Sequence, residues 1–167
     1  KALECIQAMH EKHPAGSPKA IGVFVDDSPD VVNHISQRAG LDGVQFAGEE
    51  APEDVRRVAG IRFKGISLKS LDRLGRYDVN AYLCDTYAPH EKGGTGRPYE
   101  YALLQPYMVH HAIIVAGGLT PETVGDVVRS LQPWGVDVSS ALEAAPGKKD
   151  WSKMQAFVAA VRQASED

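Results

Sequence analysis

Six short apolar segments recur along the chain, and stretches with helical periodicity separate them. Between the first two segments, Val31, Val32 and Ile35 fall on one face of a helix, away from the polar side chains. Strands that alternate with helices in this way form parallel sheets made of βα units, because a parallel neighbour needs a long crossover connection. The chain is therefore predicted to be an α/β protein with strands within residues 20–26, 42–48, 61–67, 80–85, 112–118 and 134–140.

Three predicted helix starts share one pattern, a proline followed by an acid. They are Ser28-Pro29-Asp30, Ala51-Pro52-Glu53 and Thr120-Pro121-Glu122. Proline suits the first helical position, and an acid in the first turn complements the helix dipole. The second start follows the first by 23 residues and the third follows the second by 69, three times 23, so one βα unit is predicted to repeat along the chain.

The length of 167 residues, 43% of them hydrophobic, suits one core, so residues 1–167 are predicted to be a single domain. Repeated βα units allow an open doubly wound sheet or a closed (β/α)8 barrel. The first strand is not followed by G-x-G-x-x-G, whereas polar or glycine residues end several strands, which favours the barrel. A helix at 1–12 and six strands leave such a barrel two strands short.

The composition excludes several classes of protein. The net charge is −4 and the basic residues are scattered, which argues against a nucleic-acid partner. No apolar run reaches the ~18 residues of a spanning helix, so we expect a soluble cytoplasmic protein without a membrane partner. Cys5 and Cys84 have no C-x-x-C spacing, so neither a disulfide nor a zinc site is expected, and no cofactor is expected.

Five stretches of the chain are distinctive: GVFVD (22–26), VQFAGEE (44–50), CDTYAPHEKGGTGRPYEY (84–101), AGGLTPETV (116–124) and VDVSSALEAAPGKKD (136–150). Together they resemble the phosphoribosylanthranilate isomerase family of tryptophan biosynthesis. The resemblance implies a β/α barrel that catalyses an Amadori rearrangement, in which a general acid opens a ribose ring and a general base removes the C2′ proton. The ligand would be a small phosphorylated substrate or a phosphate ion.

The resemblance also suggests site residues. Asp85 ends a strand, and alternation places it on the same face as Leu83. It matches the family's general acid, although it could merely cap the next loop. Gly117 and Gly118 end one strand and Ser139 and Ser140 end the next, where bare N–H groups could bind phosphate. A glycine-rich loop, implied to close near the substrate, adds Gly93, Gly94 and Gly96.

The match to the family fails at one essential place. The family's general base is a cysteine in a Lys-Ile-Cys-Gly segment on strand one, and an arginine after strand two meets the substrate carboxylate; neither segment is present. Cys84 points to the helix side by alternation. We therefore expect a barrel that lacks strand 1, helix 1 and strand 2, with little or no isomerase activity and with open sheet edges through which it could self-associate.

Smaller departures also touch the expected site. Ala47 stands where the family has histidine, Ala141 replaces a glycine, and Tyr99-Glu100-Tyr101 replaces Phe-Asp-Trp. Lys148 and Lys149 are expected to be solvated loop charges. The alternative to a truncated isomerase is a non-catalytic partial barrel that keeps a phosphate site. Another phosphate-binding barrel, such as indole-glycerol phosphate synthase, is disfavoured by the PGKKD and GGTG stretches.

Overall fold

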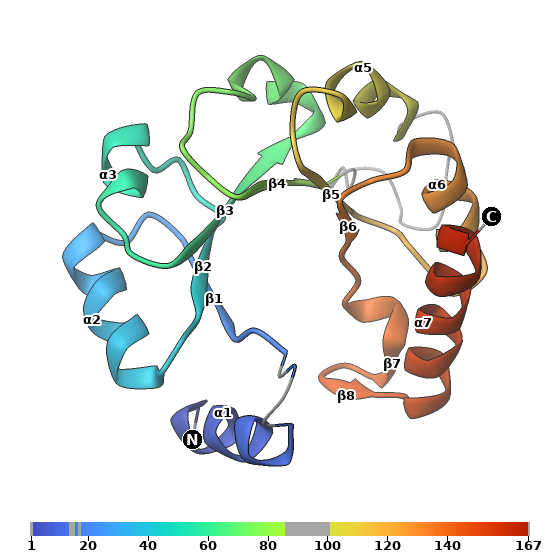
Figure 1. Ribbon diagram of the computed structural model, residues 1–167, viewed down its shortest axis with the longest axis horizontal. Coiled ribbons are helices and arrows are strands. Elements are labelled where there is room, and N and C mark those ends of the chain that lie inside the picture. Colours follow the sequence, from blue (N-terminus) through green and yellow to red (C-terminus); the bar gives the residue numbers. More distant parts are fainter. Residues whose placement is uncertain (1, 14–15, 17, 86–100, 167) are drawn as a thin grey trace. The chain divides into compact units, whose positions relative to one another are not determined.

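A parallel sheet of six strands confirms the predicted α/β class. The computed structural model describes residues 2–13, 16, 18–85 and 101–166 (Figure 1). The strands follow one another across the sheet in chain order, and each lies within a segment that the apolar pattern predicted. They are β1 (Ile21–Phe24), β2 (Gly43–Phe46), β3 (Ile61–Ser67), β4 (Ala81–Asp85), β5 (Ile113–Ala116) and β6 (Gly135–Val136).

The chain divides into two compact units. The first comprises residues 1–65 and 73–82, and the second comprises residues 66–72 and 83–167. The single domain remains a prediction. In the order of the strands, β1 and β6 are the terminal strands, and Val23 and Val25 of the first unit are 62% and 60% exposed.

The first unit holds β1, β2 and most of β3 in parallel register. Phe24 pairs with Phe46, and Phe46 pairs with Lys64. Two of its helices start at the predicted prolines, Pro29 and Pro52, whose fixed φ suits the first helical turn. Its helices are α1 (Ala2–Lys12), α2 (Pro29–Ala39) and α3 (Pro52–Arg56). The short 3₁₀ segment η1 (Leu68–Arg73) belongs mostly to the second unit.

A buried ion pair joins β3 to the loop after β2 in the first unit. Lys64 Nζ lies 3.0 Å from Glu50 Oε2, and the two side chains are 0% and 3% exposed. Lys64 also donates to the Gly48 carbonyl at 2.6 Å, and Glu50 Oε1 accepts from the N–H groups of Asp26 and Gly48. Burial alone would raise the pKa of Glu50, but these hydrogen bonds and the Lys64 charge lower it overall.

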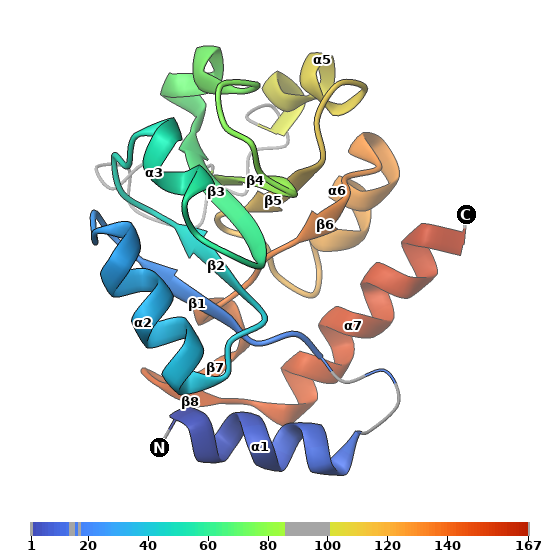
Figure 2. The same cartoon turned by 60° about the vertical axis from the view of Figure 1, so that its left-hand side comes forward.

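The second unit contains a parallel β5–β6 pair and two helices that pack together. Val115 pairs with Val136, and helix α6 (Val124–Leu131) lies beside α7 (Trp151–Glu166) (Figures 1 and 2). The chain between α6 and α7 also forms an antiparallel hairpin, which the sequence did not predict. The remaining elements are η2 (Ala102–Leu104), α5 (Gln105–Met108), η3 (Ser140–Leu142) and the hairpin strands β7 (Glu143–Ala145) and β8 (Lys148–Lys149).

The third predicted helix start was wrong by three residues. Helix α6 begins at Val124 rather than at Pro121, and Thr123 is its N-cap. The Thr120 N–H donates to Thr123 Oγ1 at 3.0 Å, and the Glu122 N–H donates to Thr120 Oγ1 at 3.2 Å. These side-chain hydrogen bonds hold the residues before the helix as a turn, because threonine hydroxyls compete with the helical backbone for its donors.

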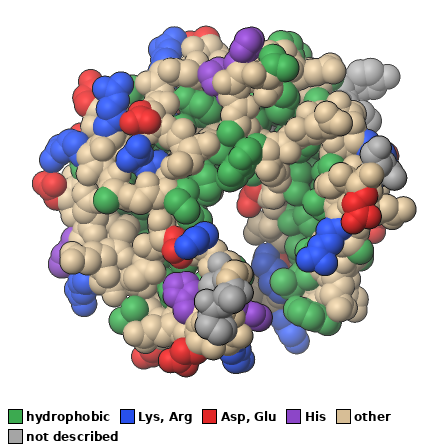
Figure 3. Space-filling view, in the orientation of Figure 1, with side chains coloured by type: hydrophobic (Ala, Val, Ile, Leu, Met, Phe, Trp, Pro, Cys, Tyr) green, Lys and Arg blue, Asp and Glu red, His purple; other side chains and the backbone are tan. Residues whose placement is uncertain are grey.

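The surface agrees with the dispersed charge of the sequence. On the face shown in Figure 3, Lys and Arg side chains alternate with Asp and Glu side chains instead of gathering in one patch. None of the helices in the described part of the chain has the length and apolar character needed to cross a membrane.

Candidate functional site

A pocket of about 450 Å³ lies in the second unit, beside the carboxyl ends of its strands. It brings together five of the predicted site residues, from three separate stretches of the chain. These are Asp85 at the end of β4, Gly117 and Gly118 after β5, and Ser139 and Ser140 after β6. The rest of the lining is Ala116, Leu119, Thr120, Asp137, Val138 and Ala141.

The backbone after β5 takes a form that glycine permits. Gly117 has φ +88° and Gly118 has φ +68°, both in the left-handed region that side chains rarely adopt. The segment that follows β6 is held beside β5, since the Asp137 N–H donates to the Val115 carbonyl at 2.8 Å. Within the described residues, the Gly118 N–H donates to no protein acceptor, so it can serve a ligand.

Two carboxyl groups, those of Asp85 and Asp137, line this pocket. The pKa of Asp137 is raised, first because the atoms around its carboxyl displace water and second because the charge of Asp85 repels a second negative charge; Lys149 opposes both effects. Asp137 is still an exposed residue, so water screens part of this effect. The raised pKa makes Asp137 easier to protonate than an ordinary aspartate.

Lys149 is exposed, as predicted for a loop charge, but its ammonium group also has defined partners. Its Nζ donates to the Ser139 carbonyl at 2.9 Å and lies 3.0 Å from Glu143 Oε1. The pKa of Glu143 is lowered, mainly by this hydrogen bond and then by the Gly147 N–H. The β7–β8 hairpin brings Lys149 back to the end of β6, which a local view of the sequence could not foresee. Its ammonium group therefore adds positive charge beside Ser139.

Neither cysteine is suited to act as a base in this pocket. Cys84 is fully buried in β4, and burial raises the pKa of its thiol to about 12. This agrees with the alternation that directed its side chain away from the Asp85 face. Cys5 is exposed on α1 of the first unit and does not line the pocket.

The remaining predicted site residues, Gly93, Gly94 and Gly96, lie outside the described residues. Within residues 2–13, 16, 18–85 and 101–166, no group of three or more His, Cys, Asp and Glu side chains could hold a metal ion.

Sequence reasoning gave Asp137 no role, noted Tyr101 only as a departure from the family pattern, and treated Lys149 only as a loop charge. A signal for Asp137 was available, because it stands at the end of a strand as Asp85 does. For Tyr101, whose hydroxyl donates to the Gly117 carbonyl, no local signal existed, since the contact joins residues 16 positions apart.

Comparison with known proteins identifies the family. The family model for N-(5'-phosphoribosyl)anthranilate (PRA) isomerase matches residues 3–160. The N-(5'-phosphoribosyl)anthranilate isomerase of Trichlorobacter lovleyi is 36% identical over 150 residues, which cover 87% of this chain and 73% of that protein. The phosphoribosyl anthranilate isomerase structure from Thermotoga maritima superimposes with a TM-score of 0.83 at 27% identity, covering 96% of this chain and 80% of that chain.

A further solved structure is informative because of its ligand. It is a phosphoribosyl anthranilate isomerase in complex with reduced 1-(o-carboxyphenylamino)-1-deoxyribulose 5-phosphate, with a TM-score of 0.79 and 26% identity over 96% of this chain and 79% of that one. The family match spans nearly the whole sequence and both compact units. This chain therefore belongs to the phosphoribosylanthranilate isomerase family of tryptophan biosynthesis.

Proposed function

We propose that this chain carries the acid and the phosphate-binding half of the isomerase site. The observation that supports this most strongly is a single pocket lined by Asp85, Asp137, two glycines and two serines. In the solved relative, the bound product analogue has a 5-phosphate. The substrate here would be N-(5-phosphoribosyl)anthranilate, converted by an Amadori rearrangement to the carboxyphenylamino-deoxyribulose phosphate.

The phosphate would bind where β5 and β6 end. The Gly118 N–H has no acceptor among the described residues, and the absence of a Cβ at Gly117 and Gly118 lets an anion approach the backbone. Lys149 supplies positive charge beside Ser139, although its ammonium group also forms an ion pair with the Glu143 carboxylate. These local donors suit a dianion in a chain that has no basic cluster.

Asp85 would act as the general acid. It donates a proton to the ribose ring oxygen, the bond from C1′ to that oxygen breaks, and a protonated imine remains. A base then removes the C2′ proton, and the resulting enolamine becomes the aminoketose. Asp137 would support the acid, because mutual repulsion of two nearby carboxylates favours states in which one of them holds the proton.

In our proposal, neither of the two cysteines supplies the base. Cys84 is excluded by burial and by its pKa of about 12, and Cys5 does not line the pocket. Loss of a general base lowers rates by about 10²–10⁴-fold, so the chain by itself is expected to turn over slowly. The described sheet has six strands in chain order, and the chain covers 80% of the Thermotoga maritima structure.

Inorganic phosphate tests the binding half. Millimolar phosphate is expected to raise the melting temperature, because a ligand that binds only the folded form stabilises it. Gly118→Val should abolish the shift by placing a branched side chain beside the pocket. The matched control is Gly40→Val, since Gly40 has φ +69° at the end of α2 and imposes similar backbone strain. Equal phosphate shifts in the two variants would count against the site.

Product formation from phosphoribosylanthranilate tests the acid. Asp85→Asn is expected to lower the rate of the chain by about 10²–10⁴-fold, whatever its absolute value. Asp126→Asn is the control, because Asp126 is exposed on α6, pairs with Arg129 and does not line the pocket. A wild-type rate within tenfold of ordinary family members would overturn the proposed lack of a base.

A further inference from the structure

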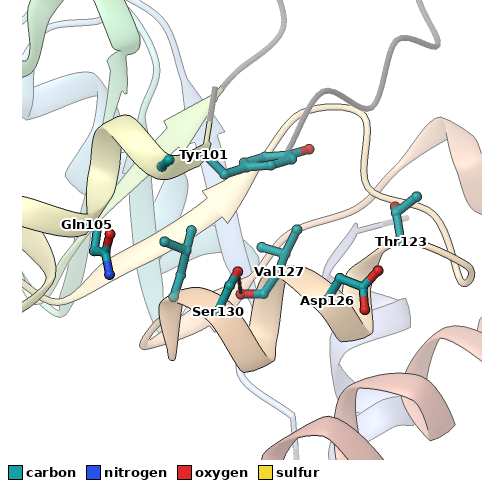
Figure 4. A pocket seen from close by; sticks show the side chains of 8 residues that line it. Tyr101, Gln105, Thr123, Asp126, Val127 and Ser130 are labelled. Carbon is teal, nitrogen blue, oxygen red and sulfur yellow. Dashed lines mark hydrogen bonds between the residues drawn. The ribbon is translucent and has the colours of Figure 1, made fainter. Parts of the chain in front are cut away.

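Tyr101 links the end of β5 to a second cavity of the same unit. It is 6% exposed and precedes η2. Its ring lines a cavity of about 420 Å³ between the η2–α5 segment and α6, where Figure 4 shows Tyr101 and Gln105 facing Val127 and Ser130. Its hydroxyl group donates a hydrogen bond to the Gly117 carbonyl. One side chain therefore packs on the helix layer and reaches the backbone of the pocket that contains Asp85.

The Gly117 carbonyl belongs to the peptide group that carries the Gly118 N–H. A trans peptide is planar, so its carbonyl and its N–H point in opposite directions. Holding the carbonyl toward Tyr101 consequently holds the Gly118 N–H away from Tyr101. That N–H has no protein acceptor among the described residues, and Gly118 lines the pocket.

Two consecutive glycines make this peptide unusually free to rotate. Gly117 and Gly118 both have positive φ, but glycine populates negative φ as readily. No side chain at either position restricts the backbone. An external contact is therefore needed if the Gly118 N–H is to keep one direction, and the Tyr101 hydroxyl supplies such a contact.

We propose that Tyr101 is a positioning residue for phosphate: its hydroxyl fixes the Gly117–Gly118 peptide so that the Gly118 N–H is presented to the phosphate group of the substrate. This inference rests on the proposed phosphate site. Tyr101 acts through the glycine backbone and does not itself contact the ligand. Removing the hydroxyl leaves the N–H in place but takes away one contact that sets its direction, so phosphate binding weakens although no group that touches the phosphate is lost.

The test compares two buried tyrosines. Tyr101→Phe removes the hydroxyl that holds the Gly117 carbonyl, and the matched control is Tyr82→Phe. The Tyr82 hydroxyl is also bonded to backbone, donating to the Tyr77 carbonyl at 3.0 Å and accepting from the Gly75 N–H at 2.9 Å. Both variants lose a hydrogen bond from a buried hydroxyl to the backbone, but only Tyr101→Phe loses a hydrogen bond to a residue that lines the pocket.

The readout is titration with inorganic phosphate, followed by the amide resonances of ¹⁵N-labelled protein. In the wild-type chain the Gly118 amide is expected to shift on phosphate addition. Tyr101→Phe is expected to weaken phosphate binding about three- to tenfold, the worth of one ordinary hydrogen bond, and to reduce the shift at Gly118. Tyr82→Phe should lower thermal stability and leave the phosphate affinity unchanged.

The outcomes separate this inference from the proposed function. If phosphate moves no amide of the pocket in the wild-type chain, both fail. If the wild type binds and Tyr101→Phe binds equally well, with the same Gly118 shift, only the role of Tyr101 is overturned. If Tyr101→Phe does not fold, the ring-carbon resonance next to the Tyr101 hydroxyl in the wild type must respond to phosphate, and an unchanged resonance would refute the proposal.

Discussion

Two pairs of charged side chains, one in each compact unit, illustrate opposite uses of charge. In the first unit, Lys64 and Glu50 are oppositely charged, almost completely buried and 3.0 Å apart. In the second, Asp85 and Asp137 carry like charge and line an exposed pocket. The first pair satisfies its own hydrogen bonds within the fold. The second leaves its acids facing a space that a substrate could fill.

The two pairs also shift pKa values in opposite directions. The lowered pKa of Glu50 means that its stabilising contribution is present above its usual value of 4.5 and is lost as the pH falls through the lowered value. The raised pKa of Asp137 has the opposite sign: the folded state binds the proton more tightly, so stability falls as the pH rises from 3.8 through the raised value. The ion pair of Glu50 with Lys64 therefore stabilises the folded state at neutral pH, whereas the repulsion between Asp137 and Asp85 destabilises it.

The largest expected effect is on stability, from breaking the buried pair. Lys64→Met leaves the Glu50 carboxylate buried without its partner, which is expected to lower the free energy of unfolding by about 3–5 kcal/mol. Lys69→Met is the control, because Lys69 is exposed, and it should change stability by no more than about 0.5 kcal/mol. Urea unfolding at pH 7 measures both.

A double variant sharpens the same point. Glu50→Gln combined with Lys64→Met removes both charges, while the glutamine oxygen can still accept from the N–H groups of Asp26 and Gly48. It is expected to be more stable than Lys64→Met alone, because an unpaired buried charge is worse than no charge. If the double variant were the less stable of the two, the loss would come from packing and not from the unpaired carboxylate.

A smaller effect is expected in the pH dependence of unfolding. Below about pH 4.5 the wild-type chain should lose stability as Glu50 gains a proton, since the unfolded state binds it more readily. The Glu50→Gln, Lys64→Met double variant should lose less over the same range. Urea unfolding from pH 7 to pH 3.5 provides the comparison, and parallel curves for the two proteins would show that Glu50 does not carry this acid sensitivity.

The smallest expected effect concerns the like-charge pair. Asp137→Asn removes the repulsion with Asp85, so at pH 7 the melting temperature should rise by no more than about 2 °C, because water screens an exposed pair. Any isomerase rate should fall at the same time. A calorimetric scan and a rate assay on one sample check both, and a lower melting temperature would mean that the two carboxyls do not oppose folding.

The sequence predicted the sheet well because strand formation depends on local apolar patterns. All six strands fall within the predicted segments, and Pro29 and Pro52 begin their helices. Prediction failed where side chains compete with the backbone, as at the turn before Val124. The β7–β8 hairpin was also missed, because its short strands at Glu143 and Lys149 carry no period-two apolar signal.

For the site, the sequence by itself determined which residues end the strands: Asp85, the double glycine and the double serine. Parallel strands place their carboxyl ends along one edge, so gathering these residues in one pocket follows from the pattern. Only the tertiary structure decided the roles of Asp137, Lys149 and Tyr101. Their effects come from a neighbouring charge, a returning hairpin and a hydroxyl 16 residues away, and such contacts exist only when distant parts of the chain are folded together.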